Sequence, residues 1–241
     1  MQKWILVLCL ISISLGACNI LPSATHTSAN KSKTKTIAAV VPVKKPRTKT
    51  EKQQQDRFIK TSTKRFKSRQ KAGAYYVAKA KRNYNQEKID SAKYLFGRAW
   101  ILDSTNADIY WGYGKVYGEQ KQYDKALAML NKALKNDKNN PRLLTDIATS
   151  HLGRYYQTSN PEDLQKSKKL LEKAVKLDPT KAEAHYKLAI SSYYLREYNK
   201  AWDNLHKSVK QDKSVADARF ITALLHKQQD PKGIYKKQRR K

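Results

Sequence analysis

The sequence is poor in the residues from which most chemical sites are built. It has two cysteines, five histidines and eight glycines in 241 residues. The glycines form no Gly-rich phosphate loop. The histidines lack the pairings that metal ligation or a nucleophile and its base would need. We therefore predict no metal, no cofactor, no catalytic residue and no small-molecule substrate, and we expect that the protein is not an enzyme. The scattered histidines are His26, His151, His185, His206 and His226.

Acidic residues are also scarce, with 20 Asp and Glu against 50 Lys and Arg and a formal net charge of +30. Between residues 31 and 72, 15 Lys and Arg are opposed only by Glu51 and Asp56. From Lys227 onward, seven basic residues are opposed only by Asp230. Most of the excess charge is thus expected on flexible ends. Such ends favour anionic partners, namely lipid head groups, wall polymers or nucleic acid. The alternative is a solvated basic tail with no specific partner.

One apolar run opens the sequence. Lys3 precedes an almost wholly apolar segment from Trp4 to Leu15, which ends in small residues before Cys18. This pattern predicts a secretory signal peptide over residues 1–17. The run is well short of the roughly 20 residues of a spanning helix, so an uncleaved membrane anchor is the weaker alternative. Cys9 leaves with the signal, and a mature chain with one cysteine can form no internal disulfide.

The four residues Leu15-Gly16-Ala17-Cys18 resemble the lipobox of bacterial lipoproteins. The resemblance implies cleavage before Cys18, a diacylglycerol group on its thiol, and an acyl chain such as palmitate on its new amino group. Several acyl chains anchor a protein stably, whereas one chain alone binds marginally. Asn19 stands where an aspartate would favour the inner membrane. We expect a cell-membrane location, on the outer membrane facing the periplasm if the organism is Gram-negative.

Residues 18–72 are rich in Thr, Ser, Lys and Gln and show almost no helical apolar period. This composition predicts a disordered, lipid-anchored basic linker that acts as an extended arm. Its last part carries Phe58, Ile59 and Phe66. The alternative is that Arg57 to Lys71 forms a short helix in contact with the domain that follows.

From Gly73 onward, apolar residues recur at helical spacing and the sequence repeats itself. Related stretches begin at Ala92, Ala126, Ser167 and Ala201. The first two starts are separated by 34 residues, and so are the last two. This spacing is the period of the tetratricopeptide repeat (TPR).

The sequence is similar to TPR proteins over Gly73 to Val215. The resemblance implies an all-α, right-handed solenoid of helical hairpins, in which small residues such as Gly114 and Ala189 let paired helices approach closely. We predict a TPR domain over 73–228 with repeats at about 73–106, 107–140, 141–181 and 182–215, a capping helix at 216–228 and a basic tail at 229–241. The residues at characteristic positions are Tyr110, Tyr113, Gly114, Tyr117, Tyr123, Ala126, Leu130 and Ala133 in the second repeat and His185, Leu188, Ala189, Tyr198, Ala201 and Leu205 in the fourth.

Two departures from the family pattern stand out. The first repeat has Lys79 and Asn83 where large apolar residues are expected, as terminal repeats often do. The third repeat is about seven residues too long between His151 and Asn160, which predicts an extended helix or a loop around Gly153 to Glu162. This insertion is either functional or simply tolerated length. We expect His185 to fill a core position.

The TPR resemblance also implies a concave groove lined by the first helix of each repeat. A groove that mixes aromatic side chains with cations suits a peptide that has apolar residues and some acidic character. The alternative is that several of the tyrosines only pack against a neighbouring helix. The carboxylate clamp of chaperone-binding TPR domains is not reproduced. The predicted peptide-binding residues are Lys81, Tyr84, Trp111, Lys115, Arg142, Tyr186, Tyr193 and Tyr194.

These features predict a membrane-anchored adaptor that binds a protein or peptide ligand in the cell envelope, in cell-wall, pilus or outer-membrane assembly. The alternative is an envelope protein that binds anionic polymer through its basic linker and tail. That polymer would be peptidoglycan, lipopolysaccharide or nucleic acid.

Overall fold

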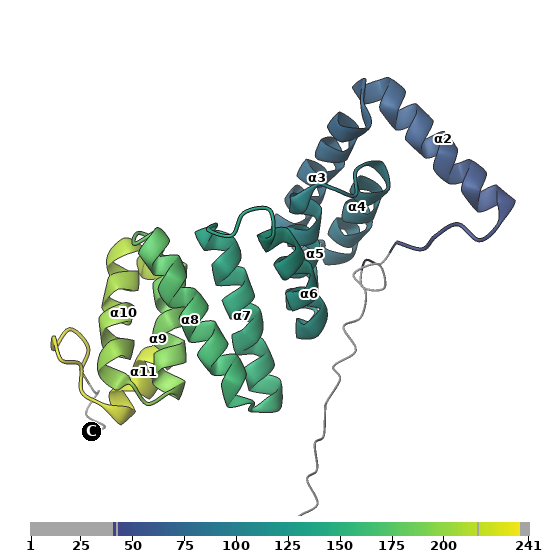
Figure 1. Ribbon diagram of the computed structural model, residues 1–241. Helices are drawn as coiled ribbons and strands as arrows, with labels where there is room; N and C mark the ends of the chain where they lie inside the picture. Colours follow the sequence, from purple (N-terminus) through teal and green to yellow (C-terminus); the bar gives the residue numbers. More distant parts are fainter. Residues whose placement is uncertain (1–40, 42, 216, 237–241) are drawn as a thin grey trace, which may run out of the picture. The chain divides into compact units, whose positions relative to one another are not determined.

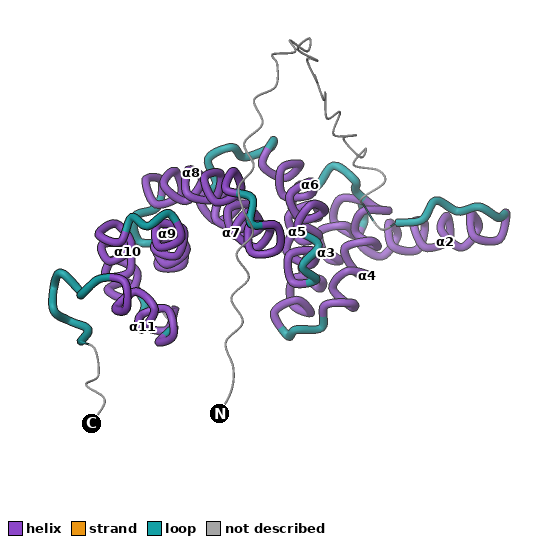
Figure 2. Tube along the Cα trace, turned by 90° about the horizontal axis from the view of Figure 1, so that it is seen from below, coloured by secondary structure: helices purple, strands orange, loops and turns teal. Residues whose placement is uncertain are grey.

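The computed structural model describes residues 41, 43–215 and 217–236. The predicted signal peptide, the lipobox with Cys18 and the first part of the linker lie outside the described residues, as does the tail beyond Lys236. Within the described part, every regular element is a helix (Figures 1 and 2).

Four helical hairpins follow one another along the chain. They are α3 (Arg69–Asn85) with α4 (Ile89–Leu102), α5 (Ala107–Glu119) with α6 (Tyr123–Leu134), α7 (Pro141–Thr158) with α8 (Pro161–Leu177), and α9 (Ala182–Tyr194) with α10 (Tyr198–Gln211). The second helix of each hairpin packs on the first helix of the next. A short 3₁₀ helix, η1 (Lys213–Val215), leads to α11 (Ala218–Lys227), which packs on α10. The predicted solenoid of four repeats with a capping helix is confirmed.

Close contacts between paired helices depend on glycine at the predicted position in α5. A Cβ on Gly114 would overlap the side chain of Leu130 in α6, and one on its neighbour Gly112 would overlap the ring of Phe96 in α4. Tyr113, between them, is fully buried. The helices therefore approach to a distance that only a missing side chain permits.

The insertion in the third repeat lengthens both helices of that hairpin. Asn140 and Asn160 cap the amino ends of α7 and α8, and a proline follows each of them. This order of residues is favourable at a helix start. Ser159 adopts a left-handed conformation with φ of 55° and makes the short turn. Of the two predicted outcomes, the structure has the extended helix.

A buried ion pair fixes this longer hairpin. The side chain of Asp163 is 2% exposed and accepts hydrogen bonds from Arg154 Nε at 2.9 Å and Nη2 at 2.6 Å. His151 Nδ1 lies 2.7 Å from the same carboxylate, and Arg154 also reaches Asp124 in α6 at 2.7 Å. Burial raises the pKa of Asp163, but the bonds from Arg154 and His151 outweigh it and hold the pKa below its usual value.

His185 has the packing role that was predicted for it. The residue is 5% exposed. Its Nε2 lies 3.0 Å from the carbonyl oxygen of Pro179, to which it donates, and its Nδ1 lies 3.0 Å from Oδ1 of Asn204. The ring thus joins α9 to α10 and to the end of the preceding hairpin.

The prediction of disorder up to about Ala72 is wrong for residues 49–72. Helix α2 spans Lys49–Phe66, and α3 already begins at Arg69. Thr48 and Glu51 form a capping box at the start of α2. Two aromatic contacts then hold α2 on α3, Phe58 with Tyr76 at 5.5 Å and Phe66 with Tyr75 at 4.6 Å between ring centroids. The alternative of a helix in contact with the domain is correct, although this helix starts eight residues earlier than Arg57.

The first part of the predicted flexible tail is also folded. Asp230 is buried and accepts hydrogen bonds from the backbone N–H groups of Lys232, Ile234 and Tyr235, each at 2.9 Å. Its carboxylate lies 3.0 Å from Nε2 of His206 in α10. The ring of Tyr235 stacks on that histidine and on Trp202, at 6.3 and 6.0 Å between centroids. One buried carboxylate thus closes a turn that returns the chain to α10.

Candidate functional site

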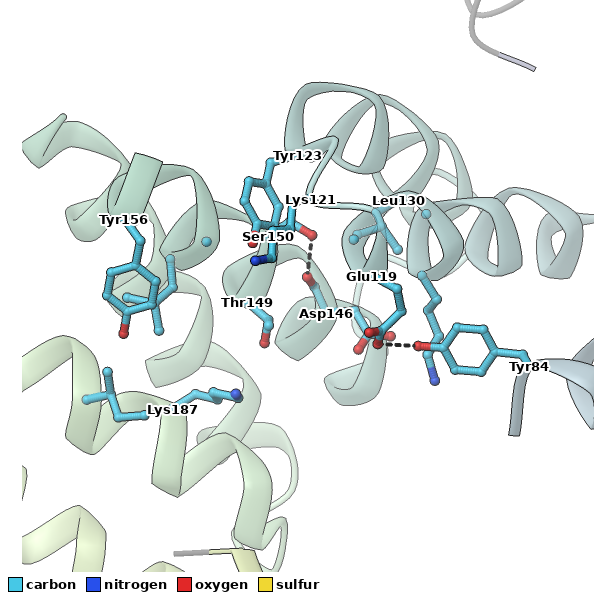
Figure 3. Close-up of a pocket in the computed structure, with 16 residues that line it drawn as sticks. Tyr84, Glu119, Lys121, Tyr123, Leu130, Asp146, Thr149, Ser150, Tyr156 and Lys187 are labelled. Atoms are coloured by element: carbon cyan, nitrogen blue, oxygen red, sulfur yellow. Dashed lines mark hydrogen bonds between the residues drawn. The ribbon is translucent and has the colours of Figure 1, made fainter. Parts of the chain in front are cut away.

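Two adjoining cavities lie along the first helices of the four hairpins, α3, α5, α7 and α9. Their volumes are about 340 and 330 Å³, and they share Tyr84, Lys115 and Asp146 in their linings. We call the two cavities together the groove. Figure 3 shows Tyr156 and Lys187 toward one end of the first cavity and Tyr84 with Glu119 toward the other.

Hydrogen bonds cross the groove from one first helix to the next. Trp111 Nε1 in α5 donates to Oδ2 of Asp146 in α7 at 2.5 Å. The Tyr84 hydroxyl in α3 donates to Oε1 of Glu119 in α5 at 2.8 Å (Figure 3). We call these two bonds the cross-repeat bonds. These bonds hold the rings of Trp111 and Tyr84 in place through the polar atoms at their edges.

The cross-repeat bonds involve two groups with shifted pKa values, Asp146 and Tyr84. Burial raises the pKa of Asp146, against the lowering effects of the Trp111 hydrogen bond and of the nearby Lys115. Burial and the hydrogen bond to Glu119 both raise the pKa of Tyr84, so its phenol stays protonated and remains a donor. Lys115 lies 4.6 Å from the centroid of the Tyr84 ring, a cation–π contact.

Cations exceed carboxylates in the groove. Lys81 is paired with Asp108, with Nζ and Oδ2 3.0 Å apart. The excess favours a ligand with carboxylates over a cationic one. The groove is lined by the cations Lys81, Lys115, Lys121, Arg142, Lys181 and Lys187 and by the carboxylates Glu119, Asp146 and Glu183.

The model of the tetratricopeptide-repeat family matches residues 84–145, which run from the end of α3 through the second hairpin into α7. Residues 84–145 are thus tetratricopeptide repeats. This repeat generally forms a non-catalytic fold for protein interaction. A search of curated proteins finds none that matches the chain.

Solved structures share the TPR fold. TTC0263, a thermophilic TPR protein of Thermus thermophilus, has a TM-score of 0.55 at 16% identity, with 64% of this chain and 80% of that protein covered. PilF of Pseudomonas aeruginosa has a TM-score of 0.55 at 21% identity, with 66% and 70% covered. YrrB, described as a TPR protein with an unusual peptide-binding site, has a TM-score of 0.50 at 23% identity, with 66% and 79% covered. At these identities the likeness concerns the fold alone.

Five of the eight predicted site residues lie in the TPR groove. They are Lys81, Tyr84, Trp111, Lys115 and Arg142, and all come from α3, α5 and the start of α7. The groove positions of the TPR family thus predict the location of these side chains correctly in the first two repeats. Their peptide-binding role stays a prediction.

The three tyrosines of α9 do not line the groove. Tyr186 is 9% exposed, packs on Phe220 of α11 at 5.6 Å, and accepts a hydrogen bond from the backbone N–H of Asp217. Tyr193 also packs on Phe220, at 5.7 Å, while Tyr194 is 43% exposed beside other tyrosines. Helix α11 covers the side chains of Tyr186 and Tyr193 through Phe220. The alternative, that these tyrosines only pack against a neighbouring helix, is therefore correct for Tyr186 and Tyr193.

The prediction missed Asp146, Tyr156 and Lys187. Position within the repeat favours Thr145 as a groove residue instead, but Thr145 is fully buried and bonded to the carbonyl oxygen of Pro141. A sequence signal for Asp146 does exist. Asp146 follows Trp111 by 35 residues, as Glu119 follows Tyr84, which is one repeat period plus one residue.

Among the described residues, no three His, Cys, Asp or Glu side chains gather as a metal site would need. None of the helices described combines the length and the hydropathy of a membrane span.

Proposed function

We propose that the protein is a membrane-anchored adaptor that holds a segment of a partner protein in the TPR groove. The groove itself carries this proposal, because it continues over four helices and presents two cross-repeat bonds with aromatic faces at its floor. Trp and Tyr supply contact area at low cost in side-chain entropy, and they dominate many interfaces.

The chemistry of the lining points to an extended or helical peptide with apolar and acidic residues. Lys187 lines the groove and belongs to none of the ion pairs of the described residues, so it can orient a ligand carboxylate. Arg142 also lines the groove, and its charge already acts on Asp178. Trp111, Tyr84 and Tyr156 offer apolar contact. The description of YrrB as having a peptide-binding site supports this class of ligand.

The anchor is the second half of the proposal. The lipobox resemblance at residues 15–18 assigns acylation to Cys18, which would fix the scaffold to the outer face of the cell membrane. In a Gram-negative organism the expected place is the outer membrane facing the periplasm. Envelope assembly, as for the cell wall or a pilus, is the context that such an anchor suits.

In-cell crosslinking of the full chain, followed by identification of the captured protein, tests the groove. Trp111→Ala removes the aromatic floor and should abolish capture of that partner, while helix content measured by circular dichroism is retained. Tyr94→Ala is the matched control, because Tyr94 is 61% exposed on α4 and lies outside the groove. A partner that Trp111→Ala still captures at wild-type yield would rule out the groove as its site.

Acylation is tested separately. Cells fed with labelled palmitate should incorporate it into the wild-type protein and not into Cys18→Ser. Label that persists in the variant would contradict the anchor and leave the groove unaffected.

A further inference from the structure

Helix α2 presents a basic row on one face. Lys49, Gln53, Arg57, Lys60 and Lys64 follow one another at intervals of three or four residues, and all five are exposed. This spacing places them on one side of a helix. Over 15 residues the row is about 22 Å long at 1.5 Å per residue. We call these five residues the cationic ridge.

The four cations of the ridge exceed the one carboxylate beside them, that of Asp56, which lies four residues before Lys60. Among the ion pairs of the described residues, none includes a cation of the ridge. Other cations of this region are engaged, since Arg98 lies 3.9 Å from the centroid of the Phe58 ring and Arg65 lies 5.2 Å from that of Phe66. The Glu51 carboxylate caps the helix and is turned toward Arg47 and Thr48.

The opposite face of α2 fixes the direction of the ridge. Ser62 is buried at 6% exposure, and Phe58 and Phe66 make the aromatic contacts with Tyr76 and Tyr75 on α3. Because these residues face the solenoid, the ridge faces away from it. Figure 1 shows α2 directly before the first hairpin, joined to the start of α3.

We propose that the cationic ridge rests on the anionic phospholipid head groups of the membrane that carries the anchor. This inference rests on the proposed acylation of Cys18. Lys49 follows that residue by 31 positions, so the chain between them spans at most about 110 Å at 3.5 Å per residue. The tether therefore holds the ridge at a high effective concentration near the bilayer surface.

The shape of the ridge favours a lipid surface over nucleic acid. The aromatic residues of α2 pack inward on α3, so the ridge offers no exposed ring on which bases could stack. Clustered cations on an exposed helix next to a membrane anchor are what anionic head groups attract. A ridge engaged in this way leaves the groove free for its ligand.

Vesicle co-sedimentation with the unacylated chain from Asn19 onward tests the ridge, since this chain keeps every described residue. We expect binding to vesicles that contain phosphatidylglycerol and little binding to pure phosphatidylcholine, with a steep fall as salt is added. Changing Lys49, Arg57, Lys60 and Lys64 together to Gln should weaken the partition about fivefold per charge, on the order of several hundredfold in all.

A matched variant removes the same charge elsewhere. Lys135, Lys169, Lys176 and Lys210 are exposed on the repeats, and changing all four to Gln should leave binding within about threefold of wild type. A second ridge variant that exchanges Lys for Arg and Arg57 for Lys keeps the charge and should keep the binding. This variant separates charge from any effect of the substitutions on the helix.

A probe reports the position of the ridge directly. The chain from residue 19 has no cysteine, so Gln53→Cys provides a single labelling site in the centre of the ridge. A fluorophore there should be quenched by a quencher on the lipid head groups, whereas one at Lys169→Cys should not be.

Three results would overturn the proposal. The first is an equal loss of vesicle binding in the two Gln variants. The second is wild-type binding by the variant in which Lys49, Arg57, Lys60 and Lys64 are Gln. The third is ridge-dependent binding to a nucleic acid or another soluble polyanion without binding to vesicles. The acylation test with Cys18→Ser is independent, because the vesicle experiment uses a chain without lipid. Failure of the anchor and failure of the ridge are thus distinguished.

Discussion

Helix α5 contains two glycines whose replacement by alanine should have opposite effects. Gly112 faces Phe96, and a methyl group there would overlap the ring. Around Gly118, six residues later in the same helix, no heavy atom beyond the adjoining residues and backbone of α5 lies within 4 Å of the position of an added Cβ. Comparing the two substitutions separates the effect of close packing on stability from the effect of helix propensity within one helix.

The expected magnitudes follow from two opposing terms. Alanine in place of glycine favours the helix by up to about 1 kcal/mol in its interior and by less near its end, where Gly118 lies. An extra methyl in a packed core costs about 1–3 kcal/mol. Phe96 is 1% exposed and cannot swing into solvent. We therefore expect Gly112→Ala to destabilise the fold by about 1–2 kcal/mol and Gly118→Ala to stabilise it by about 0.5 kcal/mol.

Urea unfolding followed by far-ultraviolet circular dichroism measures the difference. With a slope of about 2 kcal/mol per molar urea, the midpoints of the two variants should differ by roughly 1 M. Equal midpoints, or a Gly112→Ala variant as stable as wild type, would refute the claim that α5 approaches α4 at a distance set by the missing side chain.

Three carboxylates give further predictions. Asp163→Asn should cost roughly 2 kcal/mol at neutral pH, since it breaks a buried pair with the partly exposed Arg154. Because the pKa of Asp163 is lowered, its contribution is present above the ordinary value of 3.8 and is lost as the pH falls through the lower value, so the midpoints of variant and wild type should converge in acid. The raised pKa of Asp146 predicts that Trp111 fluorescence titrates with a midpoint above 3.8, and that Asp146→Asn abolishes this transition. Asp230→Ala should open the C-terminal turn, so that brief trypsin treatment releases the end of the chain, as mass spectrometry would show.

The repeats were predictable because their packing repeats with the chain. Ala92 and Ala126 are both fully buried at the small-residue positions of the second helices, as the 34-residue period predicts. For residues 49–72 we preferred disorder over the alternative of a short helix because composition outweighed local pattern, although Thr48 with Glu51 is a capping box and the two phenylalanines lie on one face. Composition and net charge do not predict the two aromatic contacts by which α2 packs on α3.

The groove was predicted in its first half and not in its second for a related reason. Position within a repeat places Trp111 and Lys115 correctly, because α5 has a further repeat on each side. It fails for Tyr186 and Tyr193, because the neighbour of α9 is the shorter helix α11, which covers them through Phe220. The C-terminal turn escaped prediction because the acceptor role of Asp230 depends on contacts that only the folded chain brings together.

The cross-repeat bonds make the groove part of the mechanics of the solenoid. Each bond joins side chains on helices that belong to successive repeats, so the angle between those repeats and the position of the groove floor change together. A ligand that takes over Asp146 or Glu119 as its own acceptor would release one of these joints. Binding of the peptide would then change the stiffness of the joint between neighbouring hairpins.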